Sequence, residues 1–288
     1  MFRRWAHRAW AVGLVAAMLI AGSGLAAARD AGSDKAAHDY LALGDSVPFG
    51  FNPLVDPRDP RNFVGYPENA AGQLELGLTN ASCPGETSGG FISMTGTDNS
   101  CRPYRAAFPL HVSYQGTQLD FALSFLRSHP RTKLVSLTLG ANDLFVCQKT
   151  TADQCTSPVE LAATLATYER NLTTILTAIR SVYHGRLVAV TYYSTNYRDL
   201  TVTGSAAALN AVTAKVTARF GGEVADGFTA FARAAAASGG DSCAAGLLIK
   251  KPDGTCDIHP SATGAQLLAR ALTAVAVRHR SDGDRSAA

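Results

Sequence analysis

Short apolar runs of strand length alternate along this chain with longer segments of helical pattern. Asp39–Gly44 is a short apolar run that predicts a buried strand, and Lys133–Gly140 (KLVSLTLG) predicts a strand buried on both faces. Further strands are expected at Leu78–Ser82, Arg186–Tyr193 and Glu223–Asp226, and helices at Tyr66–Leu76, Gln118–Ser128, Pro158–Val182, Ser205–Phe220 and Pro260–Arg278. Strands that alternate with helices are typical of an α/β protein whose mainly parallel sheet is covered on both faces.

Two segments interrupt this alternation. Phe51–Phe63 is rich in proline, aspartate and asparagine, which predicts a surface loop. Cys83–Gly116 is longer and carries glycine, serine, threonine and proline throughout. A loop of that length is usually functional or held by a crosslink. Neither an internal repeat nor a linker is evident, so we expect one domain across residues 39–280.

The N-terminus has the pattern of a signal peptide. Three arginines lie among the first eight residues, an apolar stretch follows, and Ala26–Ala28 provides an A-x-A cleavage site. An uncleaved membrane anchor is the alternative, but the apolar stretch contains glycine and serine and is short for a span. We therefore expect a signal peptide over residues 1–28, secretion after cleavage near Ala28, a flexible segment over 29–38 and a disordered tail over 281–288.

Charge and cysteine content narrow the picture further. The net charge is +3 over 288 residues, with much of the excess at the N-terminus and no basic stripe, so nucleic acid is not an expected partner.

An even number of cysteines in an exported protein predicts disulfides, and pairing of sequence neighbours is the most economical of the possible connectivities. No C-x-x-C occurs and no histidine clusters with the cysteines, so no metal is expected. The cysteines are Cys83, Cys101, Cys147, Cys155, Cys243 and Cys256.

The first strand ends in Gly44-Asp45-Ser46, which is the first candidate for chemistry. Open α/β sheets bind ligands at the carboxyl ends of their strands, and a serine there is a candidate nucleophile. The ordinary alternative is a serine that caps the following helix. The chain has no complete G-x-S-x-G motif, which argues against an ordinary α/β-hydrolase.

Three further blocks follow in sequence. Gly85 comes after the second strand, Asn142 after the strand Lys133–Gly140, and His259 directly before the last helix. A glycine backbone N–H and an asparagine amide can donate hydrogen bonds to a developing oxyanion, and a neutral imidazole can serve as a general base. Taken singly, these residues could equally be a turn glycine, a turn or helix-cap asparagine, and a surface histidine.

The order serine, glycine, asparagine, histidine resembles the SGNH (GDSL-type) hydrolase family, which is named for these four residues. The resemblance runs from Asp39 to the last helix, on Gly44-Asp45-Ser46, Gly85 within N-A-S-x-x-G-E-T-S, Gly140-x-Asn142-Asp143 and His259-Pro260. It implies a three-layer α/β/α sandwich around a central, mainly parallel five-stranded sheet, and ester hydrolysis. The six cysteines are similar to those of the secreted, disulfide-bonded esterase and lipase branch.

The resemblance also implies roles. Ser46 would be the nucleophile and His259 the base, while the N–H groups of Ser46 and Gly85 and the side chain of Asn142 would form the oxyanion hole. The family usually has an aspartate three residues before the histidine, but here that position is Cys256 and the aspartate is Asp257. Either Asp257 orients His259 or a main-chain carbonyl does so and leaves a Ser–His dyad. Asp45 and Asp143 are expected to be structural.

The function expected from the sequence is that of a secreted esterase or lipase that needs no cofactor. Aromatic residues in the two long loops, among them Phe63, Phe91 and Tyr104, could line a substrate pocket or form a small core beneath the loops. A polysaccharide deacetylase, a phospholipase and a non-catalytic extracellular binding protein are the alternatives. The expected partner is a small-molecule or lipid ester, with transient contact to a lipid surface. Neither the ester and its chain length nor the oligomeric state can be read from the sequence.

Overall fold

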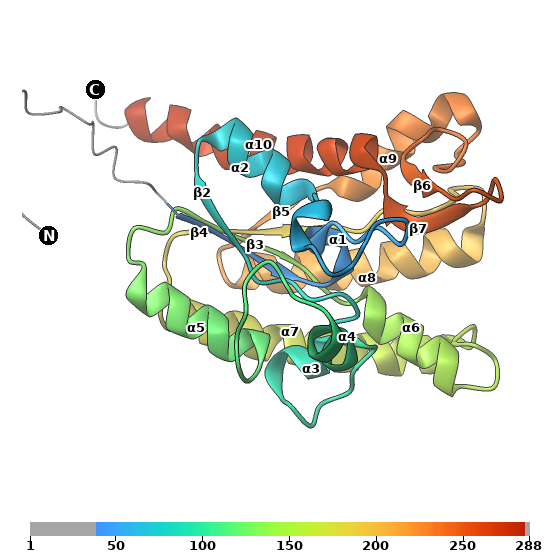
Figure 1. The fold of residues 1–288 in the computed structure, drawn as a ribbon, viewed down its shortest axis with the longest axis horizontal. Coiled ribbons are helices and arrows are strands. Elements are labelled where there is room, and N and C mark those ends of the chain that lie inside the picture. The colour runs from blue at the N-terminus through green and yellow to red at the C-terminus, as the bar shows by residue number, and fades with distance from the viewer. Residues whose placement is uncertain (1–38, 286–288) are drawn as a thin grey trace, which may run out of the picture. The chain divides into compact units, whose positions relative to one another are not determined.

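A five-stranded parallel sheet forms the centre of the fold, as the sequence predicts. The computed structural model describes residues 39–285, and for residues 278–285 it describes the backbone alone. From one edge to the other, the strands are β2 (Gly77–Asn80), β1 (Asp39–Gly44), β3 (Leu134–Thr138), β4 (Arg186–Val190) and β5 (Glu223–Ala225), as Figure 1 shows.

Helices cover both faces of this sheet, so the predicted three-layer α/β/α arrangement is confirmed. One face carries α2 (Tyr66–Leu74), α9 (Gly227–Ala235) and α10 (Ala262–Arg285), and the other carries α5 (Gln118–Ser128), α7 (Pro158–Arg180) and α8 (Leu200–Arg219) (Figure 1). The shorter elements lie in the connections: α1 (Ser46–Phe49), η1 (Pro60–Asn62), α3 (Ser88–Ile92), α4 (Cys101–Ala107), α6 (Ala141–Thr150) and η2 (Ala236–Ser238).

The strand order creates a switch point between β1 and β3. After β1 the chain moves to the outer strand β2, and it then returns past β1 to form β3 on the other side. The connections that leave β1 and β3 therefore run in opposite directions. In sheets with this order, a crevice forms at the carboxyl ends of these two strands, and ligands bind there.

The central strands are buried on both faces, and their few polar side chains are paired. Every residue of β3 is buried, including Ser136 and Thr138. The hydroxyl of Tyr40 lies 2.7 Å from that of Ser136, and the hydroxyl of Tyr66 lies 2.9 Å from that of Thr138. Because unpaired buried hydroxyls would destabilise the fold, these tyrosines allow a strand with alternating polar residues to occupy the core.

Three segments at the carboxyl end of the sheet differ from the prediction. The supposed loop Cys83–Gly116 contains α3 and α4, and the residues after Gly140 form α6. These helices are short or carry weak apolar periodicity, so the sequence pattern does not reveal them. The segment before α10 is an antiparallel hairpin of β6 (Leu248–Lys250) and β7 (Cys256–Pro260), so Pro260 ends a strand instead of starting the last helix.

Boundaries also differ at the helix ends. Helix α8 begins at Leu200, five residues before the predicted start, because the Asp199 side chain accepts hydrogen bonds from the N–H groups of Thr201 and Val202. Helix α10 extends to Arg285, so residues 281–285 of the expected disordered tail are helical.

The expected signal peptide and flexible segment, and residues 286–288, lie outside the described residues. None of the helices described is both long and apolar enough to cross a membrane.

Three disulfides are present, and they join cysteines that are neighbours in sequence. The pairs are Cys83–Cys101, Cys147–Cys155 and Cys243–Cys256. The first pair is buried in a small second core with Phe49, Phe63 and Leu110, below the long loop after β2. The last pair joins the residue before Asp257 to the segment that precedes β6. Each disulfide thus restrains a connection at the carboxyl end of the sheet.

Removal of the Cys83–Cys101 disulfide should destabilise the protein more than removal of Cys147–Cys155. The Cys83→Ala/Cys101→Ala variant loses the closure of an 18-residue loop, an effect of about 3 kcal/mol, and leaves space in the second core. The Cys147→Ala/Cys155→Ala variant opens an 8-residue loop and should lose about 2 kcal/mol. Urea unfolding of both variants measures the difference, and equal losses would contradict the expectation.

Candidate active site

Ser46 lies directly beyond the switch point, at the first residue of α1. Strand β1 ends at Gly44, whose φ is +127° and whose position leaves no room for a side chain, because a Cβ there would collide with the carbonyl oxygen of Thr138. The side chain that caps α1 is that of Asp45, which accepts a hydrogen bond of 3.0 Å from the N–H of Val47. Ser46 is therefore not the helix cap, and its hydroxyl is available for another partner.

That partner is His259. The Nε2 atom of His259 lies 2.8 Å from the Oγ atom of Ser46, although 213 residues separate them in sequence. The other ring nitrogen, Nδ1, is hydrogen-bonded to the carboxylate of Asp257. A carboxylate only accepts, so Nδ1 carries the proton, and Nε2 is left to accept the hydrogen bond of the Ser46 hydroxyl.

Strand β7 explains why Asp257 reaches His259 although it stands two residues before it. Side chains two residues apart on a strand point to the same side, so the Asp257 carboxylate can reach the His259 ring. The Asp257 carboxylate also accepts a hydrogen bond of 3.0 Å from the His259 main-chain N–H. The hydrogen bond from the His259 ring lowers the pKa of Asp257 below its usual value and so favours the charged carboxylate.

Gly85 and Asn142 lie on the other side of Ser46. Gly85 has a φ of +83°, and a Cβ there would collide with the main chain of Asn99, so the loop needs glycine at this position. Within residues 39–285, neither the N–H of Ser46 nor that of Gly85 donates a hydrogen bond, so both remain available to a ligand. Asn142 belongs to α6, just beyond β3, and is buried.

The Asn142 amide is fixed on both sides. Its Nδ2 donates to the main-chain oxygen of Glu86 at 2.9 Å and to the Asp45 carboxylate at 3.2 Å, and its Oδ1 accepts from Asn99 at 2.7 Å. Both N–H groups are therefore engaged, and the longer hydrogen bond, to Asp45, is the weaker of the two. A ligand oxygen that used this amide would have to replace Asp45 as the acceptor.

Asp45 joins the turn that carries Ser46 to Asn142. The sequence suggested a structural role for Asp45 but not this connection. The carboxylate is buried and accepts hydrogen bonds from the Val47 N–H, from Asn142 and from the hydroxyl of Tyr192, which follows β4. Burial raises the pKa of Asp45 to about 6, and the hydrogen bonds from Tyr192 and Val47 oppose that rise. Asp143, by contrast, holds the start of α3 through the N–H and hydroxyl of Ser88.

Two cavities meet at Ser46 and His259. One, of about 280 Å³, lies toward α6 and the start of α8, and its apolar lining includes Leu144, Phe145, Tyr193, Val202, Ala206 and Leu209. The other, of about 410 Å³, lies on the Gly85 side and is more open, with Phe51, Tyr104, Asn99, Gln148 and Lys149 in its lining. The ring of Phe51 also packs on His259, at 4.9 Å between ring centroids.

The aromatic residues of the long loops are divided between the open cleft and the hydrophobic cores. Tyr104 lines the open cleft, whereas Phe63 belongs to the second core and Phe91 to the main core. Most of the apolar cavity is instead lined by α6 and α8. The sequence did not indicate these lining residues, because α6 was not recognised and the pattern of α8 resembles that of any surface helix.

Comparisons with known proteins identify the family and the fold. The sequence profile of the GDSL-like Lipase/Acylhydrolase family matches residues 42–267. The comparison with curated proteins finds no match. Solved structures with the same fold include phospholipase A1 from Streptomyces albidoflavus, which is 20% identical, with 83% of this chain and 99% of that chain covered and a TM-score of 0.57.

Two other solved structures of this fold carry different activities in their names. The extracellular lipase from Streptomyces rimosus is 21% identical, with 83% of this chain and 99% of that chain covered and a TM-score of 0.54. An acetylxylan esterase from Geobacillus stearothermophilus is 17% identical, with 83% and 94% covered and a TM-score of 0.51. At these identities the structures show a common fold, whereas the sequence profile, which spans most of the chain, shows that this protein belongs to the GDSL-like lipase/acylhydrolase family.

Proposed function

We propose that this protein is a secreted serine esterase that hydrolyses carboxylic esters with an extended acyl chain. The observation that carries the proposal is the continuous hydrogen-bonded series from Asp257 through His259 to Ser46, which faces the free N–H of Gly85. A hydroxyl beside a base, with the base oriented by a carboxylate and donors placed opposite, is the arrangement that acyl transfer requires.

Each group has a role in this reaction. The Ser46 oxygen attacks the ester carbonyl carbon while His259 Nε2 takes the hydroxyl proton, and the same proton then passes to the departing alcohol oxygen. Water then attacks the carbonyl carbon of the acyl-enzyme and gives a proton to His259, which returns it to the Ser46 oxygen as the acid departs. No step requires a group beyond the protein and water.

The negative oxygen of each tetrahedral intermediate is stabilised by three donors. Two are the main-chain N–H groups of Ser46 and Gly85, which have no competing acceptor among the described residues. The third is the Asn142 amide, which exchanges its 3.2 Å hydrogen bond to Asp45 for one to the oxyanion. Because this exchange becomes favourable only when the oxygen carries a full charge, it favours the transition state over the bound ester.

The two cavities suit the two halves of an ester. The more enclosed apolar cavity along α6 and α8 suits an acyl chain, and the open cleft with Asn99, Gln148 and Lys149 suits a polar alcohol. An acetyl group would leave most of the 280 Å³ cavity unfilled, so a longer acyl chain is favoured over polysaccharide deacetylation. A glycerol-based lipid meets both requirements.

The three disulfides support a role outside the cell. Structural disulfides persist in oxidising compartments, and the N-terminal sequence pattern provides an export signal with cleavage near Ala28. Ile258 is nearly half exposed beside His259, and Val202 is exposed at the mouth of the apolar cavity. These side chains suit transient contact with the surface of an aggregated lipid substrate.

Replacement of Ser46 tests the function itself. The Ser46→Ala variant lacks the attacking oxygen, so kcat for p-nitrophenyl butyrate should fall by about 10³-fold or more, while the fold and melting temperature stay close to those of the wild type. Purified mature protein and a stopped spectrophotometric assay are sufficient. Full activity in this variant would refute the proposed nucleophile, and an inactive wild type would favour a non-catalytic binding protein.

Replacement of Asp257 distinguishes the triad from a Ser–His dyad. Asp257→Asn keeps the size of the side chain but removes the negative charge that favours the proton on His259 Nδ1 and stabilises the protonated ring, so kcat should fall by about 10²–10⁴-fold with little change in KM. The matched control is Asp253→Asn, in the turn between β6 and β7, which should retain full activity. A loss of less than about threefold in Asp257→Asn would favour the dyad.

Narrowing of the apolar cavity tests the acyl assignment. Ala206→Phe places a ring in the cavity wall, so activity on a C12 ester should fall by about tenfold relative to a C4 ester. Ala207→Phe, the next residue of α8, is exposed and outside the lining, so it should leave the chain-length profile unchanged. A profile that shifts equally in both variants would place the acyl chain elsewhere.

A further inference from the structure

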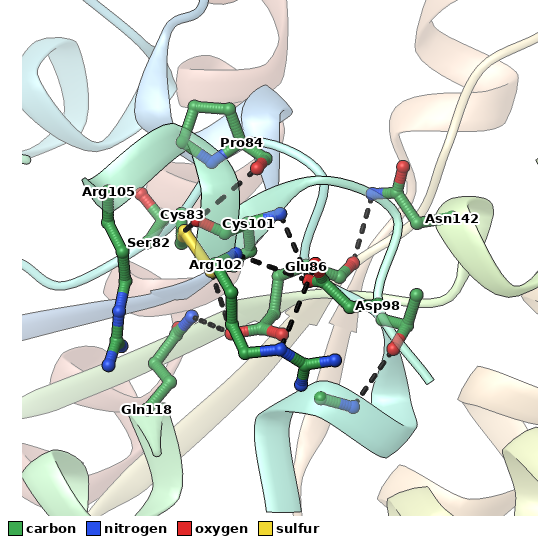
Figure 2. Close-up of a disulfide and its surroundings, with 12 residues drawn as sticks. Ser82, Cys83, Pro84, Glu86, Asp98, Cys101, Arg102, Arg105, Gln118 and Asn142 are labelled. Atoms are coloured by element: carbon green, nitrogen blue, oxygen red, sulfur yellow. Dashed lines mark hydrogen bonds and ion pairs between the residues drawn. A yellow bond between two sulfur atoms is a disulfide. The ribbon is translucent and has the colours of Figure 1, made fainter. Parts of the chain in front are cut away.

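Glu86 is a buried carboxyl group directly behind the candidate oxyanion hole, and the proposed reaction does not use it. It follows Gly85 in sequence, and only 3% of its surface is exposed. Figure 2 shows its side chain between the Cys83–Cys101 disulfide and Gln118. The carboxyl Oε2 lies 3.5 Å from the Cys101 sulfur and accepts a hydrogen bond of 3.3 Å from Gln118 Nε2.

These contacts connect Glu86 to both sides of the site. Its main-chain oxygen accepts the 2.9 Å hydrogen bond from Asn142 that holds the amide in place. Its side-chain partner, Gln118, is fully buried and pairs with the backbone of Gly44. Gln118 Oε1 accepts from the Gly44 N–H at 2.6 Å, and Gln118 Nε2 donates to the Gly44 oxygen at 3.0 Å. Glu86 and Gln118 therefore lie between the loop that carries Gly85 and the turn that carries Ser46.

The surroundings of Glu86 disfavour a negative charge. Within residues 39–285 no basic side chain forms an ion pair with it. The charged or titratable groups near it are Asp98 before α4, which is itself paired with Arg102 at 4.0 Å, Arg105 on α4 and Tyr114. Burial, with a further contribution from the charge of Asp98, raises the pKa of Glu86 to about 8, against smaller opposing effects of Gln118, Arg105 and the Thr87 N–H. Glu86 and Asp98 also lie close to the Cys101 sulfur, a grouping that could suggest a metal site. Because Cys101 is bonded to Cys83 in a disulfide, it offers no thiolate to a metal.

We propose that Glu86 is a positioning residue for the oxyanion hole and that it acts as an uncharged carboxylic acid. The uncharged form fills the space beneath Gly85, accepts the Gln118 hydrogen bond and places no negative charge beside the developing oxyanion. A carboxylate in this water-poor position would repel the oxyanion strongly, because the effective dielectric constant of a protein interior is low. The inference rests on the proposed ester hydrolysis.

Ionisation of Glu86 should therefore limit activity in the alkaline range. As pH rises past about 8, the Glu86 carboxylate forms, and kcat should decline. The stability of the folded state should also depend on the ionisation of Glu86. The folded state retains this proton while the unfolded chain, with an ordinary glutamate pKa near 4.5, has lost it, so Glu86 destabilises the fold progressively as pH rises from about 4.5 to about 8.

The decisive variant is Glu86→Gln, which keeps the shape of the uncharged acid and cannot ionise. Wild-type kcat should be roughly tenfold lower at about pH 9.5 than at about pH 7.5, whereas the decline should be absent from Glu86→Gln. Hydrolysis by Ser46→Ala protein is subtracted at each pH. Thermal melts should show that Glu86→Gln gains stability over the wild type at about pH 9 and less at about pH 5.

The Asp98→Asn variant should move the alkaline decline of kcat to lower pH, whereas Glu86→Gln should remove the decline. Removal of the Asp98 charge lowers the pKa of Glu86, so the alkaline decline of kcat should begin at lower pH than in the wild type. Asparagine retains the oxygen that accepts the Cys101 N–H at the start of α4, so the fold is preserved. Glu75→Gln, an exposed carboxyl group at the end of α2, is the matched control and should leave the profile unchanged.

The outcomes separate this inference from the proposed function. An alkaline decline of kcat that persists in Glu86→Gln, or that does not move to lower pH in Asp98→Asn, overturns the role of Glu86 even if Ser46→Ala abolishes hydrolysis. Activity that survives in Ser46→Ala overturns the proposed function instead. If Glu86→Gln does not fold, the Asp98→Asn profile alone decides, because that variant leaves Glu86 in place.

Discussion

The pairing of β1 with β3 is the interaction on which the site depends. These parallel strands run side by side from Tyr40 opposite Leu134 to Gly44 opposite Thr138, and the Asp45 N–H donates to the Thr138 oxygen just beyond the last pair. Because both strands end at the same level, Ser46 and Asn142 emerge together, 96 residues apart in the chain. A shift of the register by one residue would reverse the faces of the strand and separate the two side chains. The requirement for glycine at Gly44 follows from the same close approach.

Buried carboxyl groups on either side of Ser46 show how hydrogen bonding sets charge. Asp45 accepts from three donors, the Val47 N–H, Tyr192 and Asn142, and its pKa rises only to about 6. Glu86 accepts from the Gln118 amide and the Thr87 N–H and lies near the like charge of Asp98, and its pKa rises to about 8. Burial is the largest cause of the rise in both groups, and their partners act in addition to it. The hydrogen bonds to Asp45 favour its charged form, whereas the Asp98 charge favours the uncharged form of Glu86.

The position of His259, the proposed base, depends on the hairpin of β6 and β7. The sequence left open whether Asp257, displaced by one residue from the family pattern, could reach His259. On an extended strand the two-residue spacing places both side chains on the same side, and the Cys243–Cys256 disulfide restrains the segment immediately before them. The hydrogen bond from His259 Nδ1 to Asp257 then follows from local geometry. A three-residue spacing would suit a different backbone, such as a helical turn.

The sequence by itself determined the α/β class and the central strands, because apolar runs are local features. Its Gly-Asp-Ser and Gly-x-Asn motifs, which are equally local, marked Ser46 and Asn142 as candidates beyond β1 and β3. It also pointed to neighbouring cysteines as disulfide partners, which requires only short loops. The tertiary structure alone decided that α6 and α8 wall an apolar cavity, that Tyr192 donates to Asp45, and that Gln118 joins Gly44 to Glu86. These contacts link residues 32 to 147 positions apart, and the side chains involved are common in any core. Pairings at that distance arise from the packing of helices on the sheet, which no local pattern records.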